Sequence, residues 1–206
     1  MVLIIDHVDS FTFNLREFIH RAGMDARVVP WNDLPPDREI FACAAVVVSP
    51  GPGRPAHYPS TLDLLRRCPD HLPVLGVCLG HQMMGVADGA EIIPAHRPMH
   101  GHSSSLDLSD DHPLWAGLPR PVRVMRYHSL VLDAVPGGYR HLASADGELM
   151  AMAHVHRPWI GVQFHPESVG TEDGLRMMAN WAGLVRGATA DVGESANRSA
   201  AARDHE

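Results

Sequence analysis

A cysteine between two glycines is the first candidate for chemistry in this chain. The segment GVCLGHQ places Cys78 directly after the apolar run at residues 74–77 and before a stretch predicted to be helical. Gly-x-Cys-x-Gly at that junction has the form of a nucleophile elbow, the tight strand-to-helix turn that holds a nucleophile above a sheet. A thiol at a helix N-terminus also meets the positive end of the helix dipole, which favours the thiolate. The alternative is that Cys78 is a small buried side chain, the commonest fate of a free cysteine.

A nucleophile needs a base, and the segment Trp159–Phe164 delivers one. We expect a strand there, with His165 and Glu167 just beyond its carboxyl end. Because ligands of an open α/β sheet bind at that edge, His165 is predicted to lie near Cys78 although the two are far apart in the sequence. Glu167 could then accept a hydrogen bond from the imidazole and fix its tautomer, as the acid of a Cys-His-acid triad does. Taken alone, the segment HPE could equally be an ordinary turn.

The composition fits a folded domain of ordinary size. The chain has 206 residues, of which 45% are hydrophobic and 20% charged, enough to bury a sizeable core. No apolar run approaches the ~20 residues that cross a bilayer, and Asp6 interrupts the apolar N-terminus where a signal peptide would continue. We therefore expect a cytoplasmic protein of one domain, without a membrane segment.

Charge and metal-ligand patterns narrow the function further. The formal net charge is -7, lysine is absent, and no basic stripe with interleaved aromatic residues occurs, so nucleic-acid binding is not expected. The cysteines Cys43, Cys68 and Cys78 form neither a disulfide framework nor a CxxC pair. The 15 histidines lack the HExxH spacing of a zinc site, and we expect no metal.

Short β-type runs alternate with amphipathic stretches in the first half, the pattern of a mostly parallel sheet covered by helices. There we expect strands over residues 2–5, 26–29, 44–48 and 74–77. We expect helices over residues 10–22, 61–67 and 79–87, the first with Ser10 as its N-cap and Gly23 as its stop. In the second half, short strands extend or flank the sheet at residues 91–94, 104–108, 122–127, 140–144, 149–154 and 159–163.

The C-terminal region marks the end of the predicted domain. A last helix is expected over residues 171–185, and the Ala/Ser-rich segment after it shows no apolar periodicity. A segment without a periodic apolar face has little surface to bury against a core. We therefore predict a single α/β domain over residues 1–186 and a disordered tail over residues 187–206.

Together, several segments resemble a known family. GVCLGHQ, SPGPG, RYHSLV and GVQFHPES are similar to the signature segments of class I (triad-type) glutamine amidotransferases. The segments DSFTFNL and MHG narrow the resemblance to the glutaminase subunit, component II, of anthranilate synthase and aminodeoxychorismate synthase. The resemblance runs from Met1 to about Val185 in the family's order. It implies a flavodoxin-like α/β fold: a mostly parallel central sheet with helices on both faces and additional short strands.

The resemblance also implies a role for each site residue. Cys78 attacks the side-chain amide carbon of L-glutamine and forms a γ-glutamyl thioester, His165 transfers protons, and Glu167 supports His165. Gln82, one helical turn past Cys78, binds the amino or carboxylate end of the substrate, unless it is simply an exposed helix residue. The full implied set for glutamine and its oxyanion is Gly51, Pro52, Gly53, Leu79, Gln82, Ser129 and Leu130.

A partner is implied as well. The ammonia goes to a chorismate-binding synthase subunit, and we expect no cofactor in this chain, with Mg²⁺ only in that partner. The implied docking surface consists of two loop segments that could otherwise be plain turns: Asp9, Ser10, Phe11 and Thr12, and Met99, His100 and Gly101.

Other functions stay open. The chain could be a glutaminase for GMP or carbamoyl phosphate synthesis, or a stand-alone γ-glutamyl hydrolase, although the segments DSFT and MHG argue against both. It could also be a non-catalytic subunit that stabilises its partner, against which the intact triad argues. The product is not decided between anthranilate, aminodeoxychorismate and an aminodeoxyisochorismate, because the acceptor site lies on another chain.

Overall fold

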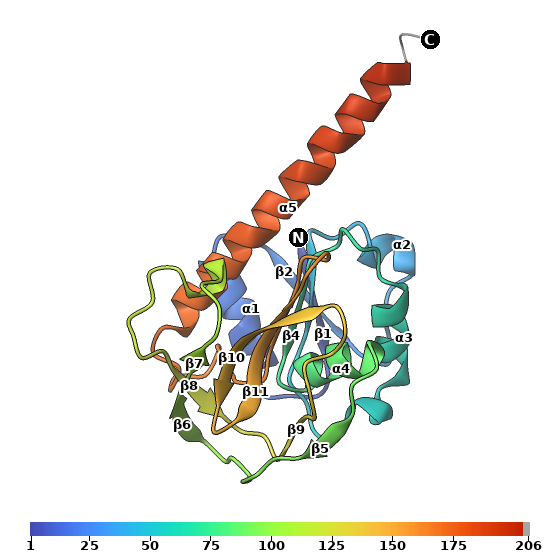
Figure 1. Cartoon of the computed structure of the whole chain (residues 1–206). Coiled ribbons are helices and arrows are strands. Elements are labelled where there is room, and N and C mark those ends of the chain that lie inside the picture. Colours follow the sequence, from blue (N-terminus) through green and yellow to red (C-terminus); the bar gives the residue numbers. More distant parts are fainter. Residues whose placement is uncertain (204–206) are drawn as a thin grey trace.

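The computed structural model describes residues 1–203, with side chains described up to residue 190. Its centre is an eight-stranded sheet in the order β2-β1-β3-β4-β12-β11-β10-β7 (Figure 1). The first five strands of that order are parallel, and the last three continue the sheet antiparallel. The strands are β1 (Val2–Asp6), β2 (Ala26–Pro30), β3 (Ala45–Val48), β4 (Val74–Val77), β7 (Asp107–Leu108), β10 (Tyr139–Ala145), β11 (Glu148–His154) and β12 (Trp159–Val162).

Two small antiparallel pairs stand apart from the main sheet. One joins β5 (Ile92–Pro94) to β9 (Leu130–Leu132), and the other joins β6 (His102–Ser105) to β8 (Arg123–Arg126). Residues 127–129 connect β8 to β9 and so bridge the two pairs. The predicted second-half strands are present, some extending the sheet and others flanking it, but the strand predicted over residues 104–108 is divided between β6 and β7. Strand β9 was not predicted.

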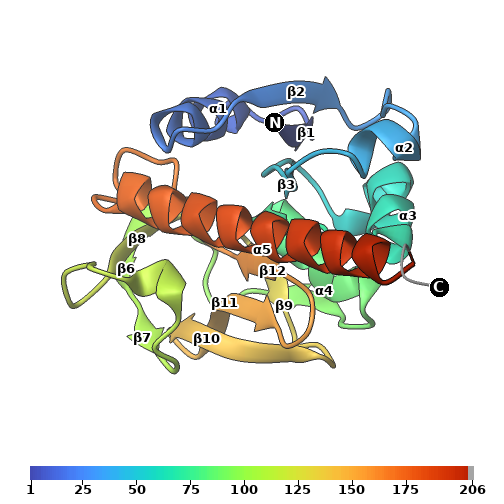
Figure 2. The same ribbon diagram turned by 90° about the horizontal axis from the view of Figure 1, so that it is seen from above.

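Helices cover both faces of the sheet because successive residues of its buried strands point to opposite sides. Val2 and Ile4 belong to one core with residues of α1 (Thr12–Arg21) and α5 (Gly174–Arg203). Leu3 and Ile5 belong to the other, with residues of α3 (Pro59–Arg67) and α4 (Leu79–Ala87). Figure 2 looks down on this arrangement, with β2 and β10 at opposite ends and α5 running across it. The remaining helical segments are α2 (Asp37–Ile40), η1 (Pro55–His57) and η2 (Pro113–Trp115).

Most predicted elements are confirmed within a residue or two, and β4 and α4 have the predicted bounds. The start of the first helix is wrong: α1 begins at Thr12, and Ser10 does not cap it. Asp6 holds this turn instead, because its Oδ1 accepts a 2.7 Å hydrogen bond from the Thr12 hydroxyl. Gly23 does end the helix, with a φ of 81° that suits glycine.

The end of the chain also differs from the prediction. Residues 187–203 continue α5 as a helix where the sequence suggested a disordered tail, and residues 204–206 lie outside the described residues. Alanine favours helix without needing a core, and the segment contains no proline, so a helix started at Gly174 can propagate through it. In the part of the chain that the structure describes, no helix has the length and apolar character that a bilayer crossing requires.

Candidate active site

The turn between β4 and α4 is strained at Cys78. This residue has a φ of 52° and a ψ of -100°, in a region that side-chain-bearing residues rarely occupy. Its backbone N–H donates to the carbonyl of Val162 at 2.8 Å, which ties the elbow to the neighbouring strand β12. A Cβ on Gly80 would lie 2.1 Å from the Val48 carbonyl oxygen, and one on Gly76 would lie 2.6 Å from the Gly80 backbone. Both flanking glycines are therefore required by close packing.

His165 and Glu167 form a buried pair next to this elbow. The Nδ1 atom of His165 lies 2.7 Å from the Glu167 carboxylate, and both residues are at most 3% exposed. Burial by itself would lower the pKa of His165, but neighbouring Cys78 and then Glu167 outweigh burial and raise it well above its ordinary value. The rings of Phe11 and Tyr127 meet the imidazole edge-on at 5.6 and 5.1 Å between centroids. The site therefore favours a charged imidazolium beside the cysteine.

A cavity of about 170 Å³ opens at Cys78. All seven residues predicted to bind glutamine line it, together with Cys78, Tyr127 and His128. His165 and Glu167 lie outside this lining. The backbone N–H of Leu79 has no intrahelical acceptor, because α4 begins at this residue. The cavity thus presents a free helix N-terminus beside the cysteine sulfur.

The loop Gly51–Gly53 also lines the cavity, and it packs tightly against His7 and Leu79. A Cβ on Gly51 would lie 2.6 Å from the Cβ of His7, and Gly53 has a φ of 81°. The buried His7 ring bonds Ser49 at 3.1 Å and Thr61 at 3.0 Å, and burial lowers its pKa to about 4. A neutral imidazole therefore supports the loop, and glycine lets the loop backbone face the cavity.

Comparison with known proteins agrees with this geometry. Residues 3–183 match the family model of glutamine amidotransferase class-I. The chain belongs to this family. The pyocyanine-specific anthranilate synthase component 2 of Pseudomonas aeruginosa is 44% identical over 192 residues, covering 89% of this chain and 95% of that protein. Aminodeoxychorismate synthase component 2 of Escherichia coli is 39% identical over 186 residues, covering 88% of this chain and 98% of that protein.

Two further comparisons concern a longer relative and a solved structure. An aminodeoxychorismate synthase of Streptomyces griseus is 46% identical over 188 residues, a match that takes up 89% of this chain and 26% of that protein. A crystal structure from Thermoplasma acidophilum, described as one subunit of a GMP synthase, superimposes with a TM-score of 0.83 at 22% identity. The match covers 94% of this chain and 96% of that protein. That likeness shows the α/β fold alone.

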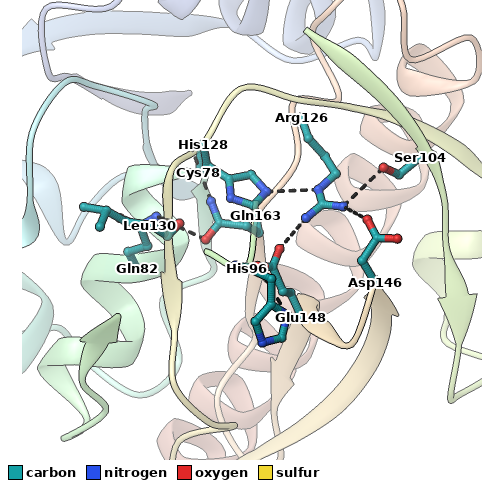
Figure 3. Close-up of polar contacts among 10 residues, drawn as sticks. All are labelled: Cys78, Gln82, His96, Ser104, Arg126, His128, Leu130, Asp146, Glu148 and Gln163. Carbon is teal, nitrogen blue, oxygen red and sulfur yellow. Dashed lines mark hydrogen bonds and ion pairs between the residues drawn. The ribbon is translucent and has the colours of Figure 1, made fainter. Parts of the chain in front are cut away.

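A chain of neutral amides reaches the Cys78 sulfur (Figure 3). The Gln82 side-chain nitrogen donates to the Leu130 carbonyl at 2.9 Å and to the Gln163 side-chain oxygen at 3.1 Å. The Gln163 nitrogen in turn donates to the Cys78 sulfur at 3.5 Å. We did not predict a role for Gln163 from the sequence, although a single amide among the apolar residues of WIGVQF is a signal that could have found it.

A charged cluster around the buried Arg126 adjoins His128, one of the residues that line the cavity (Figure 3). The fully buried Arg126 guanidinium pairs with Glu148, contacts Asp146 at 2.6 Å and donates to Ser104 at 3.2 Å. Its Nε also donates to the ring of His128 at 3.1 Å. Burial first, and then the charge of Arg126, lower the pKa of His128 to about 3, so this ring is neutral. None of these contacts was predicted from the sequence.

The residues expected to form the docking surface do not all reach the surface. Ser10, His100 and Gly101 are exposed, but Thr12 is 0% and Met99 8% exposed. The Thr12 hydroxyl donates to Asp6 instead of facing outward. That the two segments form the docking surface stays a prediction. Among the described residues, no three His, Cys, Asp or Glu side chains converge to hold a metal ion. That this chain needs no cofactor stays a prediction.

Proposed function

We propose that this chain is the glutaminase component of a chorismate-using synthase. It hydrolyses L-glutamine to glutamate and ammonia and delivers the ammonia to a chorismate-binding partner subunit. The observation that carries this proposal is the cysteine at a strained elbow, opening onto a small cavity and adjoining a buried histidine–carboxylate pair. The names of relatives such as anthranilate synthase component 2 support the choice of partner.

The triad then hydrolyses glutamine in two steps, formation of a thioester and its hydrolysis. The Cys78 thiolate attacks the side-chain amide carbon, the carbon–nitrogen bond breaks, and the His165 imidazolium gives its proton to the departing ammonia. A γ-glutamyl thioester remains. Neutral His165 next takes a proton from water, the hydroxide attacks the thioester carbon, and the carbon–sulfur bond breaks to return the thiolate. Glu167 stabilises the imidazolium and fixes its orientation.

The cavity supplies groups for the rest of the substrate. The Leu79 N–H and one from the loop at residues 51–53 would stabilise the oxyanion that forms on the amide carbon. Gln82 uses its nitrogen for both of its hydrogen bonds within the described chain, so its side-chain oxygen is left to accept from the α-ammonium group. Ser129 and Leu130 would hold the same end through main-chain atoms.

Replacement of the nucleophile tests the proposal directly. In Cys78→Ala, glutamine-dependent synthesis by the complex should be abolished, while synthesis from ammonium salts stays near the wild-type rate because the acceptor chemistry takes place on the partner. His165→Ala should lose more activity than Glu167→Gln, since the glutamine side chain keeps a hydrogen bond to the imidazole. Wild-type glutamine hydrolysis by Cys78→Ala would contradict the assignment of the triad.

The docking proposal follows from exposed apolar side chains at the edge of the sheet that carries the triad. Val169 is 98% exposed, Val8 74% and Phe13 59%. Val8 also has a φ of 61°, which a β-branched residue rarely adopts. With Ser10, His100 and Gly101, these side chains would form the contact with the synthase subunit.

A charge introduced at one edge only can test this contact. Val169→Asp should weaken assembly with the synthase subunit, measured by sedimentation or calorimetry. Val155→Asp is the matched control: Val155 is 52% exposed and follows β11, which is antiparallel to β12, so it lies at the opposite edge. Equal affinities for both variants and the wild type would remove Val169 from the interface.

The partner is also proposed to regulate the site. Uncontrolled hydrolysis would waste glutamine, and a coupling of ~1–3 kcal/mol gives a roughly 5- to 150-fold activation. The isolated chain should therefore release glutamate slowly, and faster by several-fold when chorismate and the synthase subunit are added. Equal rates with and without them would favour a stand-alone hydrolase.

A further inference from the structure

We infer that Gln163 is a further catalytic residue of this site: its side-chain N–H stabilises the Cys78 thiolate and couples it to the residue that binds the substrate. The inference rests on the proposed role of Cys78 as nucleophile. Gln163 is 0% exposed, and its nitrogen lies 3.5 Å from the Cys78 sulfur. A neutral donor at this position favours the anionic form of the sulfur without placing a second charge beside His165.

The direction of the hydrogen bonds follows from a single backbone group. The Leu130 carbonyl can only accept, so the Gln82 side chain must present its nitrogen at 2.9 Å. That same nitrogen faces Gln163 at 3.1 Å, so Gln163 must present its oxygen there. The nitrogen of Gln163 is then the atom left to face the Cys78 sulfur. The hydrogen-bond partners therefore decide which end of each side-chain amide is oxygen and which is nitrogen.

The backbone fixes where this donor sits. Gln163 follows β12 directly, and its own N–H donates to the Met150 carbonyl of β11 at 2.9 Å. The Cys78 N–H donates to the carbonyl of Val162, the residue before Gln163, at 2.8 Å. Nucleophile and donor are therefore positioned by the same strand. Because Gln163 also bonds Gln82, a change at Gln163 should affect both the sulfur and glutamine binding.

The pH dependence of alkylation reports on the sulfur itself. Iodoacetamide reacts with the thiolate, and peptide-resolved mass spectrometry separates Cys78 from Cys43 and Cys68. In Gln163→Met, which has neither donor nor acceptor, the alkylation profile of Cys78 should move to higher pH. The value of kcat/KM for glutamine at neutral pH should fall about 10- to 100-fold, as expected for a lost hydrogen bond to a charged group.

Gln163→Glu is a more specific test, because the Glu side chain keeps the shape of Gln163 and an oxygen that accepts from Gln82. A carboxylate beside the sulfur removes the donor and adds repulsion, so the alkylation profile should move further than in Gln163→Met, while KM for glutamine changes less. A merely structural role would lower the unfolding midpoint and leave the alkylation profile in place. An unchanged profile in either folded variant overturns the inference.

Gln82→Met covers the case in which neither Gln163 variant folds. It leaves Gln163 in place but removes the group that orients its amide, so the Cys78 profile should move upward by a smaller amount. No movement in that variant would also count against the inference. Failure of the proposed function looks different: Cys78→Ala would keep its activity, and alkylation of Cys78 would not inactivate the wild type.

Discussion

Two polar networks hold the segment Arg126–Leu130, and they are built from opposite kinds of group. At its start, the guanidinium of Arg126 is balanced by Glu148 and Asp146 in a buried charged cluster. At its end, the Leu130 carbonyl accepts from Gln82, the first of the neutral amides that lead to the sulfur. The segment between these anchors lines the cavity. One short piece of chain is thus fixed by charge on one side and by amides on the other.

The difference lies in where each network ends. The charged cluster ends on His128, whose neutral ring accepts from Arg126. Burial first, and then the charges of Arg126 and His165, lower the pKa of this ring. The amide chain ends on the Cys78 sulfur, the proposed reacting atom, where a full charge would disturb the proposed thiolate–imidazolium pair. We therefore expect changes in the cluster to affect mainly folding stability, and changes in the amide chain to affect mainly catalysis.

Arg126→Met should have the largest effect of the changes to these networks. It leaves Glu148, whose side chain is 3% exposed, as an unpaired buried charge. Removal of one partner of a buried pair costs about 3–5 kcal/mol of unfolding free energy, measured by urea denaturation at pH 7. The double variant Arg126→Met/Glu148→Met should recover much of this loss. A loss in the single variant no larger than that of an exposed pair would show that the cluster is not buried in solution.

Gln82→Met breaks the neutral network and should act on substrate binding. It removes the side-chain oxygen proposed to accept from the α-ammonium group of glutamine. A lost hydrogen bond to a charged group is worth about 1.5–3 kcal/mol, so KM for glutamine should rise roughly 10- to 100-fold, with a smaller change in kcat. Its unfolding free energy should fall by less than that of Arg126→Met. A stability loss as large as for Arg126→Met would erase the contrast between the networks.

His128→Gln tests the neutral ring at the end of the charged cluster. Because the pKa of His128 is lowered to about 3 in the folded chain, the unfolded chain binds the extra proton first as pH falls below ~6.5. The stability from this ring is therefore present above that pH and is lost on acidification, by at most about 1.4 kcal/mol per pH unit. In urea denaturation, the unfolding free energy of the variant should therefore fall less steeply with decreasing pH than that of the wild type. His71→Gln, at an exposed position, is the control and should keep the pH dependence of the wild type.

The elements nearest the nucleophile could be predicted because their signals are local. The bounds of β4 and α4 follow from an apolar run, two glycines and a helical stretch, and the pairing of His165 with Glu167 needs only a two-residue spacing. The cavity lining follows from motifs whose order matches a family. By contrast, α1 begins two residues late because Asp6, in the preceding strand, anchors Thr12.

The two networks could not be predicted, since each joins residues distant in sequence. Arg126 at the end of β8 meets Glu148 at the start of β11 only when the β6-β8 ribbon folds against the main sheet, and Gln163 meets Gln82 only when β12 packs beside α4. The burial of two residues was also not predictable. Thr12 and Met99 belong to the segments that the family resemblance implies for docking, but they are buried, because a motif gives the residue type and not the direction of the side chain.

Arg67→Met should have the smallest effect, and it sets the scale for Arg126→Met. The Arg67 guanidinium reaches the Asp37 carboxylate through two hydrogen bonds of 2.7 and 2.9 Å, so its geometry is as good as that of Arg126. Both side chains are more than 40% exposed, however, and water replaces the lost partner. The expected loss in unfolding free energy is about 0–1 kcal/mol, and it should shrink further as salt is added. Because the two variants delete the same side chain from an ion pair, a similar loss in both would mean that burial does not decide the cost. A loss several times larger for Arg126→Met would assign that difference to the unpaired charge of Glu148.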